Sequence, residues 1–226
     1  MNETNTPVRA LRTLHIEGLD LAGKSTVCRV LRDRWGAEMR ANSILPPGAN
    51  AIHAEAERLR KADAIPAAPL GGLYYAAMMR DIELYKPPSG PVVQDSSLIL
   101  RSIAFHSVFG DPALADAFRA WLPRHPRFGA TVVIRASDEV RRKRLEGRCS
   151  RHNDNPEDFL IVRDPAGFHR MEDILMETAE REFGATVVDT SFLERDGEKA
   201  RIADLLLSKM PANNEQRTAN CFDLPV

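Results

Sequence analysis

The chain has 226 residues, of which 43% are hydrophobic and 28% charged, and its formal net charge is −1. This length and composition are typical of one globular domain that buries a sizeable core. A net charge close to zero gives no overall field to attract nucleic acid or a membrane surface, so we expect neither as a partner.

Hydrophobic periodicity, together with Gly and Pro as punctuation, predicts strands and helices that alternate along the chain. In chain order these are strand 13–17, helix 24–35, strand 37–44, helices 51–64 and 73–85, strand 91–94, helices 98–108 and 112–121, strand 130–135, helix 138–147, helix 168–183, strand 185–189 and helix 199–210. Such alternation favours a parallel sheet covered on both faces, which binds ligands at the carboxyl ends of its strands.

Residues 211–226 show no periodicity, so we expect a loose tail after one domain that covers residues 1–210. Residues 1–8 are polar and do not look like a secretory signal, and no stretch approaches the ~18 apolar residues that span a bilayer. Cys28, Cys149 and Cys221 are too scattered for a disulfide framework or a zinc site. These features favour a cytoplasmic protein.

A phosphate-binding motif lies between the first predicted strand and the first predicted helix. It fits GxxxxGKS and is followed by Thr26: Gly18-Leu19-Asp20-Leu21-Ala22-Gly23-Lys24-Ser25. The glycines allow close approach of the backbone, and N–H groups at a helix start favour anions. Lys24 can reach the β- and γ-phosphates, and the Ser25 hydroxyl can ligate Mg²⁺. The motif therefore predicts that these residues bind ATP and Mg²⁺.

Residues 17–26 also resemble the EGxDGxGKST signature of thymidylate kinases and their relatives, with weaker matches over about residues 11–208. The resemblance implies an α/β, three-layer P-loop NTPase fold with a five-stranded parallel sheet and a helical lid at about residues 141–167. It implies an ATP-dependent phosphotransferase that moves the γ-phosphate of ATP to a small-molecule acceptor, a nucleoside monophosphate such as dTMP. It also implies a homodimer.

Glu139 and Val140 are followed by Arg144 and Arg148, at the spacing of the EVxxxRxxxR stretch before the lid of those kinases. By resemblance, Arg144, Arg148 and Arg151 are candidates to stabilise the transferred phosphoryl group. A guanidinium suits this role because it is always charged and forks onto phosphate oxygens. The alternatives are a solvated basic helix and a nuclear-localisation sequence at residues 141–144.

Asp95 ends a predicted strand, where it can hold a metal-bound water or orient an acceptor hydroxyl. The alternative is that it caps the next helix. In the resembling family an Asp-Arg pair stands here, but this chain has Asp95-Ser96, and Arg101 is the candidate substitute for the missing arginine. We expect Ser25 and Asp95 to provide the metal site.

Three further residues are candidates for binding the acceptor. Arg80 and Tyr75 lie in a stretch that resembles the aromatic-Ala-Ala-x-Arg helix, whose arginine faces the acceptor in the family. The alternatives are a surface arginine and an aromatic residue of the core. Asp20 matches an aspartate that accepts a hydrogen bond from a sugar hydroxyl in the family, and the alternative is a turn residue bonded to its own backbone.

The sequence departs from the family on the acceptor side, because residues 40–48 replace the RExGG-like loop and Ser96 replaces the arginine. A kinase of a nucleoside, or of a non-nucleotide alcohol or phosphate, is therefore an alternative. A nucleotide-binding regulatory protein with weak catalysis is another. A GTPase switch would carry DxxG and NKxD segments, and the sequence has neither in the expected context.

Overall fold

The computed structural model describes residues 9–149, 156–192 and 196–210. Its centre is a parallel sheet in which all strand pairs run in the same direction. The strands are β1 (Arg9–Glu17), β2 (Glu38–Ala41), β3 (Val92–Asp95), β4 (Arg127–Arg135) and β5 (Thr186–Asp189). Their spatial order is β2-β3-β1-β4-β5. The predicted five-stranded parallel sheet is confirmed.

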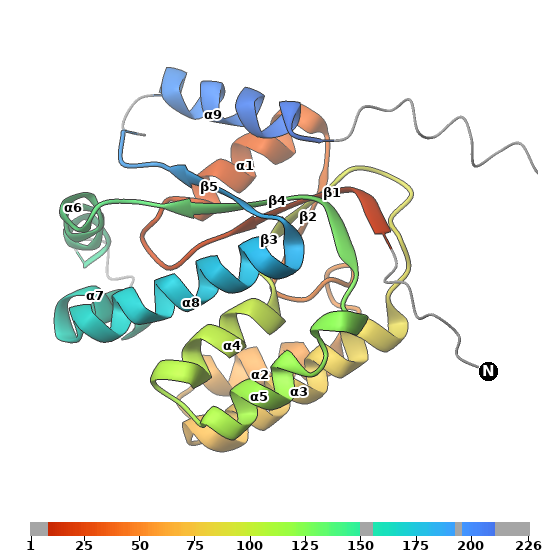
Figure 1. Cartoon of the computed structure of the whole chain (residues 1–226), viewed down its shortest axis with the longest axis vertical. Coiled ribbons are helices and arrows are strands. Elements are labelled where there is room, and N and C mark those ends of the chain that lie inside the picture. Colours follow the sequence, from red (N-terminus) through yellow and green to blue (C-terminus); the bar gives the residue numbers. More distant parts are fainter. Residues whose placement is uncertain (1–8, 150–155, 193–195, 211–226) are drawn as a thin grey trace, which may run out of the picture.

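Helices cover both faces of the sheet (Figure 1). One face carries α1 (Lys24–Trp35) and α9 (Asp196–Ser208). The other carries α2 (Ala51–Lys61), α3 (Ala67–Leu84), α4 (Leu98–Val108), α5 (Pro112–Arg119) and α8 (Pro165–Phe183). Helices α6 (Asp138–Cys149) and α7 (Leu160–Arg163) lie beyond one end of the sheet. Two short 3-10 helices, η1 (Leu122–Arg124) and η2 (Pro156–Phe159), complete the described elements. The architecture is therefore the expected three layers.

The central strands are deeply buried because helices cover both faces of the sheet. Leu14 and Ile16 of β1 have no exposed surface, and all four residues of β3 are buried. Two apolar clusters result, one between the sheet and α1 and α9, the other among α3, α4, α5 and α8. In register, Ile16 lies opposite Asp95, so the motif after β1 and the carboxylate that ends β3 emerge at the same edge of the sheet.

Helices α1 and α4 begin and end where the sequence predicts. The bounds of several other elements differ from the prediction, and β1 already begins at Arg9 rather than at residue 13. Strand β2 ends at Ala41 rather than at residue 44, because Asn42 adopts a left-handed backbone with φ 59°. Helix α3 begins at Ala67 rather than at residue 73, since Pro69 falls in its first turn, where no intrahelical N–H is needed. The polar segment before residue 168 also contains η2 and α7, which the sequence did not predict.

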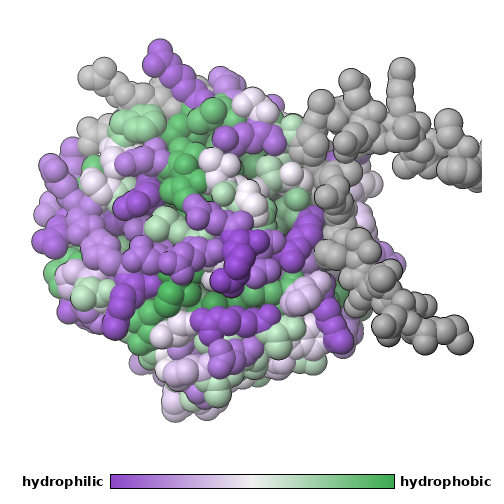
Figure 2. All heavy atoms as spheres, in the orientation of Figure 1, coloured by the Kyte–Doolittle hydropathy of each residue, from purple (hydrophilic) through white to green (hydrophobic). Residues whose placement is uncertain are grey.

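The surface in the view of Figure 2 is mainly hydrophilic, and its hydrophobic residues, in green, gather in a few narrow strips. No helix in the described ranges combines the length and the apolarity that a bilayer crossing requires. The predicted tail at residues 211–226 lies outside the described residues.

Candidate functional site

The phosphate-binding loop leaves β1 through a strained turn that requires glycine. Gly18 has a φ of 143°, and a Cβ there would lie 2.3 Å from the carbonyl oxygen of Ile134 on β4. Gly23 has a φ of 91° and is the N-cap of α1, with no side chain bonded to that helix end. Among the described residues, the amides of Lys24 and Ser25 donate no hydrogen bond within the protein. The start of α1 therefore presents free N–H groups, as phosphate binding requires.

The carbonyl groups of this loop are bound by side chains from other elements. Arg101 donates to the carbonyl of Gly18 at 3.0 Å, and Arg141 donates to the carbonyl of Asp20 at 2.8 Å. Arg144 donates to the carbonyl of Leu21 at 2.8 Å, and the Thr190 hydroxyl donates to the carbonyl of Ala22. The side chains of Leu19 and Leu21 are buried in the core. Because the carbonyls and these two side chains are fixed in this way, the conformation of the loop is set before any ligand arrives.

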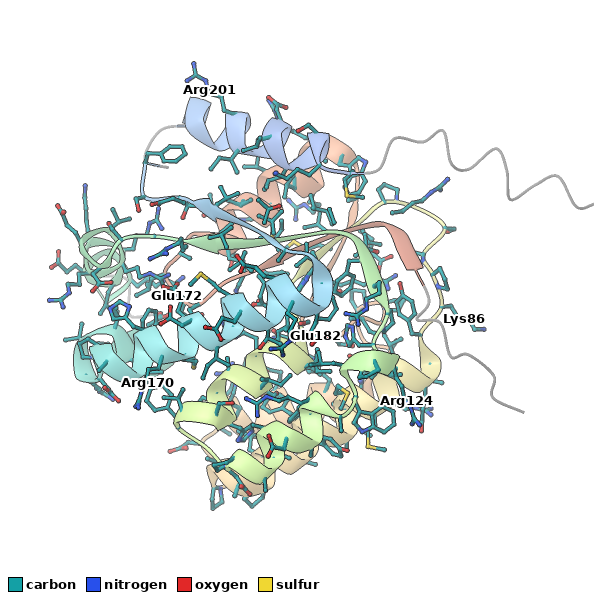
Figure 3. The ribbon with its side chains drawn as sticks, in the orientation of Figure 1. Lys86, Arg124, Arg170, Glu172, Glu182 and Arg201 are labelled. Carbon is teal, nitrogen blue, oxygen red and sulfur yellow. The ribbon has the colours of Figure 1, made fainter. Side chains whose placement is uncertain are left out.

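Arg141 is fully buried, with no exposed surface. Its Nε donates to Ala136 at 2.9 Å, one terminal nitrogen donates to Glu172, and its guanidinium lies 4.8 Å from the ring centre of Phe168. Figure 3 shows Glu172 on the side of α8 that faces the sheet, opposite to Arg170. The Arg141–Glu172 pair thus links α8 to the backbone of the phosphate-binding loop. Residue 141 is neither a solvated arginine nor an exposed localisation signal.

The candidate lid arginines have separate positions. Arg144 donates to the carbonyl of Leu21 and, at 3.0 Å, to the carbonyl of Thr190, so its guanidinium links the loop to the segment after β5. These contacts favour Arg148 over Arg144 as the arginine for the transferred group, and either role stays a prediction. Arg148, one helical turn further on, donates to the carboxylate of Asp158 at 2.5 Å. Arg151 lies outside the described residues.

Lys24 and Asp95 face each other across the start of α1. Lys24 Nζ lies 3.3 Å from Asp95 Oδ1. Asp95 does not cap α4, whose N-cap is Ser97. Asp95 is therefore at the end of the phosphate-binding loop, as expected from its place at the carboxyl end of β3.

A magnesium ion fits the donors that this region offers. The Ser25 hydroxyl and the Asp95 carboxylate are hard oxygen ligands, the kind that Mg²⁺ takes together with substrate phosphates and waters. The described residues contain no group of three His, Cys, Asp or Glu side chains that could hold a metal by themselves.

Asp20 pairs with Arg101, whose terminal nitrogen lies 3.2 Å from Asp20 Oδ2. Burial alone would raise the pKa of Asp20, but the charges of Arg101 and Lys24 outweigh it and lower the pKa. Glu17 behaves in the same way: burial opposes its ionisation, yet His15, Arg101 and Lys24 lower its pKa. Both carboxylates are therefore ionised at neutral pH.

Glu17 connects the loop with α4. Its carboxylate accepts hydrogen bonds from the backbone N–H of Gly18 at 3.0 Å and of Ser97 at 2.9 Å. Since Ser97 is the N-cap of α4, one buried carboxylate fixes the relative position of the phosphate-binding loop and the helix beside it. This matters because α4 also provides Arg101.

A cavity of about 330 Å³ opens beside the loop and extends between α2, α3 and α4. It begins at Asp20, Lys24 and Asp95 and has a mixed polar and apolar lining. The other lining residues are Ala41, Asn42, Glu57, Arg60, Ala67, Leu70, Gly71, Tyr74, Ser96, Leu98, Arg101, Ser102, Phe105, His106 and Met171. Its volume is at the small end of the range for ligand pockets.

The loop after β2 is held against the cavity by Asp81 of α3. This carboxylate is 3% exposed and accepts hydrogen bonds from the Ser43 hydroxyl at 2.6 Å, the Ile44 N–H at 3.1 Å and the Asn50 amide at 2.6 Å. Burial raises the pKa of Asp81, although these bonds oppose the rise. The segment that departs from the family's RExGG-like loop is therefore an ordered wall, which brings Asn42 to the cavity.

Two predicted acceptor-binding residues do not reach the cavity. Arg80 is half exposed and pairs with Glu83 of its own helix at 3.7 Å. The Tyr75 hydroxyl accepts a hydrogen bond from Trp121 at 2.7 Å, and its ring packs edge-on against Phe118. Arg80 therefore fits the alternative of a surface arginine, and Tyr75 fits the alternative of an aromatic residue of the core. Arg101, Asp20 and Asp95, in contrast, do meet at the cavity.

The structure brings several further residues to the site that the sequence did not predict there. Tyr74 lines the cavity in place of Tyr75, and its hydroxyl donates to Glu57 of α2 at 2.6 Å. Glu57 also pairs with Arg60 at 3.0 Å. The sequence shows the i,i+3 spacing of this pair, but exposed ion pairs on helices have the same spacing, so it did not indicate a binding site. His106 of α4 also lines the cavity, and the sequence held no signal that singled it out among the histidines.

No protein-family model matches the sequence, and no curated protein sequence matches it either. Solved structures with a similar fold include a deoxyadenosine kinase from M. mycoides with bound dCTP, at 16% identity and a TM-score of 0.55, which covers 87% of this chain and 98% of that one. A thymidylate kinase from Candida albicans has 15% identity and a TM-score of 0.61, covering 87% and 91%. A thymidylate kinase from Ehrlichia chaffeensis has 16% identity and a TM-score of 0.54, covering 87% and 96%. The chain therefore has the fold of P-loop nucleoside and nucleotide kinases.

Proposed function

We propose that this chain is an ATP-dependent phosphotransferase that moves the γ-phosphate of ATP to a hydroxyl group of a nucleoside-sized acceptor in the cavity. One observation carries the proposal: the cavity begins at Asp20, Lys24 and Asp95, the residues at the phosphate-binding loop. A nucleotide bound by the loop and an acceptor in the cavity would then meet at these side chains. Positioning and charge stabilisation are the main requirements of phosphoryl transfer.

The residues have separate roles in this proposal. The N–H groups at the start of α1 and the Lys24 ammonium hold the β- and γ-phosphates. Mg²⁺, held by Ser25 and Asp95, would neutralise charge on the phosphate oxygens. Arg148 provides the guanidinium for the transferred group, since Arg144 is occupied with loop carbonyls. Asp95 and Asp20 orient the acceptor hydroxyl.

The charges in the cavity favour an acceptor without a phosphate of its own. Each basic side chain that lines the cavity is paired with an acidic one that lines it too: Lys24 with Asp95 at 3.3 Å, Arg101 with Asp20 at 3.2 Å, and Arg60 with Glu57 at 3.0 Å. A monophosphate such as dTMP would add negative charge to a cavity whose positive charges are balanced already, which is costly away from water. A nucleoside or another neutral alcohol adds none. We therefore favour the nucleoside alternative over the monophosphate that the sequence resemblance suggests.

The test is a phosphorylation screen with Mg-ATP, in which mass spectrometry detects the phosphorylated product. The panel contains the four deoxynucleosides, their monophosphates and unrelated small alcohols. We expect turnover of at least one nucleoside and none of the monophosphates. Selective turnover of dTMP would contradict the uncharged acceptor but retain the kinase, whereas ATP binding without any product would support the regulatory alternative. Homodimerisation and a cytoplasmic location stay predictions.

A further inference from the structure

The imidazole of His106 is held rigidly at the end of the cavity away from the phosphate-binding loop. The residue is 5% exposed, and its ring stacks on Phe118 with centroids 6.2 Å apart and meets Phe105 edge-on at 5.3 Å. Two glycines make room for it: a Cβ at Gly110 would lie 2.2 Å from Nδ1, and one at Gly71 would lie 2.8 Å from Nε2. The ring therefore has one orientation.

The hydrogen bond at Nδ1 defines which nitrogen carries the proton. Nδ1 accepts from the backbone N–H of Asp111 at 3.3 Å, so in the neutral ring the proton is on Nε2. Burial lowers the pKa of His106, although the charge of Asp111 opposes this, so the ring is neutral at pH 7. Nε2 lies beside Gly71, a residue of the cavity wall, and forms no hydrogen bond within the described part of the chain. The result is one unused, oriented N–H donor at the cavity.

The residues around this donor are mainly apolar. Leu70, Phe105 and Met171 line the cavity together with His106. Along α4, His106 lies eight residues after Leu98, which corresponds to roughly 12 Å at 1.5 Å per residue. An acceptor whose reacting hydroxyl lies near Asp95 would thus extend along the helix and place an apolar part, such as a flat ring, near His106.

We propose that His106 determines which acceptor is bound, by donating a hydrogen bond from Nε2 to a ring nitrogen or carbonyl oxygen on a flat heterocycle. The proposal rests on the proposed function and adds the chemical class of the acceptor to it. A ring that presents an amino group at this position would be rejected, because two donors would face each other and neither would be satisfied. The selected acceptors would be nucleosides with an unprotonated ring nitrogen or a carbonyl on the edge near α3 and α4.

Two variants separate the donor from the packing of the ring. His106→Gln can place an amide N–H close to Nε2, whereas His106→Asn can only reach the position of Nδ1 and so keeps the contact with Asp111 but loses the donor in the cavity. Calorimetry without ATP measures the binding of the four deoxynucleosides. Single-atom analogues of the best binder, each with one ring nitrogen replaced by C–H or one carbonyl oxygen removed, are measured in the same way. Circular dichroism and thermal unfolding confirm that both variants are folded.

We expect one analogue to bind the wild type about tenfold more weakly than the parent nucleoside, the effect of one lost hydrogen bond in a buried site. The same analogue and its parent should bind His106→Asn equally, and His106→Gln should restore the difference. The proposal is overturned if the wild type binds none of the nucleosides or if His106→Asn discriminates as the wild type does. Because binding is measured without ATP, discrimination by His106 without turnover in the phosphorylation screen would contradict only the proposed function.

Discussion

Arg148 donates a hydrogen bond to Asp158 at 2.5 Å, and Asp158 is only 2% exposed. Burial raises the pKa of Asp158; the bond from Arg148 opposes this rise, while the negative charge of Asp20 adds to it. The Arg148 guanidinium has further N–H groups besides the one that Asp158 accepts.

We predict that Arg148→Ala lowers kcat by about a hundredfold or more and changes the KM of the acceptor little, because a charge that acts only in the transition state contributes to kcat. Steady-state kinetics with the acceptor identified by the screen measures both constants. Arg142→Ala is the matched control, since Arg142 is an exposed arginine of the same helix. An unchanged kcat in Arg148→Ala would remove this residue from the mechanism.

Lys24→Ala should abolish turnover while the protein stays folded. The ammonium group is the only part of the side chain that the proposed chemistry uses, and its partner Asp95 keeps 12% of its side-chain surface exposed, so solvent can replace the pair. Product formation is compared with that of Lys209→Ala, a control at an exposed lysine directly after α9, and circular dichroism checks the fold. Full activity of Lys24→Ala would rule out the phosphate-binding role of the loop.

Arg141→Ala should lower the free energy of unfolding by about 3–5 kcal/mol, because it leaves the buried carboxylate of Glu172 without its partner. Urea unfolding measures the change. Adding Glu172→Ala to this variant should recover part of the loss, since no uncompensated charge then remains. A loss below ~0.5 kcal/mol, the range of ordinary surface substitutions, would show that the pair contributes nothing.

The buried His125 should make the free energy of unfolding depend on pH in the acid range. Its Nδ1–H donates to the carbonyl of Pro126 at 2.9 Å, and burial lowers its pKa to about 3. In the unfolded chain the pKa is about 6.5, so between these values the unfolded state holds a proton that the folded state lacks. The free energy of unfolding therefore falls as the pH falls through this window, by up to about 1.4 kcal/mol per pH unit.

The measurement is urea unfolding at several pH values between 4 and 7, on the wild type and on His125→Phe. Phenylalanine suits the position because Phe128 and Phe183 pack edge-on against the imidazole. The slope of the unfolding free energy against pH should be smaller in the variant. Equal slopes would show that His125 does not titrate in this way.

The strands and the phosphate-binding loop could be predicted from the sequence because their signals are local. The loop needs glycines at fixed positions, and residues 18 and 23 adopt the positive φ angles that the motif implies. Asp95 could be placed because it stands at the carboxyl end of a buried strand, and parallel strands end at the same edge.

The acceptor side of the site was harder to predict because it is built from contacts between distant segments. Tyr74 and Tyr75 are neighbours in sequence, yet one faces the cavity and the other Trp121, and a shift of one residue on a helix decides between them. The burial of Arg141 depends on Glu172, 31 residues away. The helical spacing of the basic residues in α6 gives no signal of that partner.

The most direct test of the central claim, that the loop at residues 18–25 binds a triphosphate, is a calorimetric titration of the wild type with Mg-ATP. We predict one-to-one binding with heat release and a higher Tm, and an affinity at least tenfold weaker in Lys24→Ala. The absence of both heat and thermal stabilisation in the wild type would contradict the account.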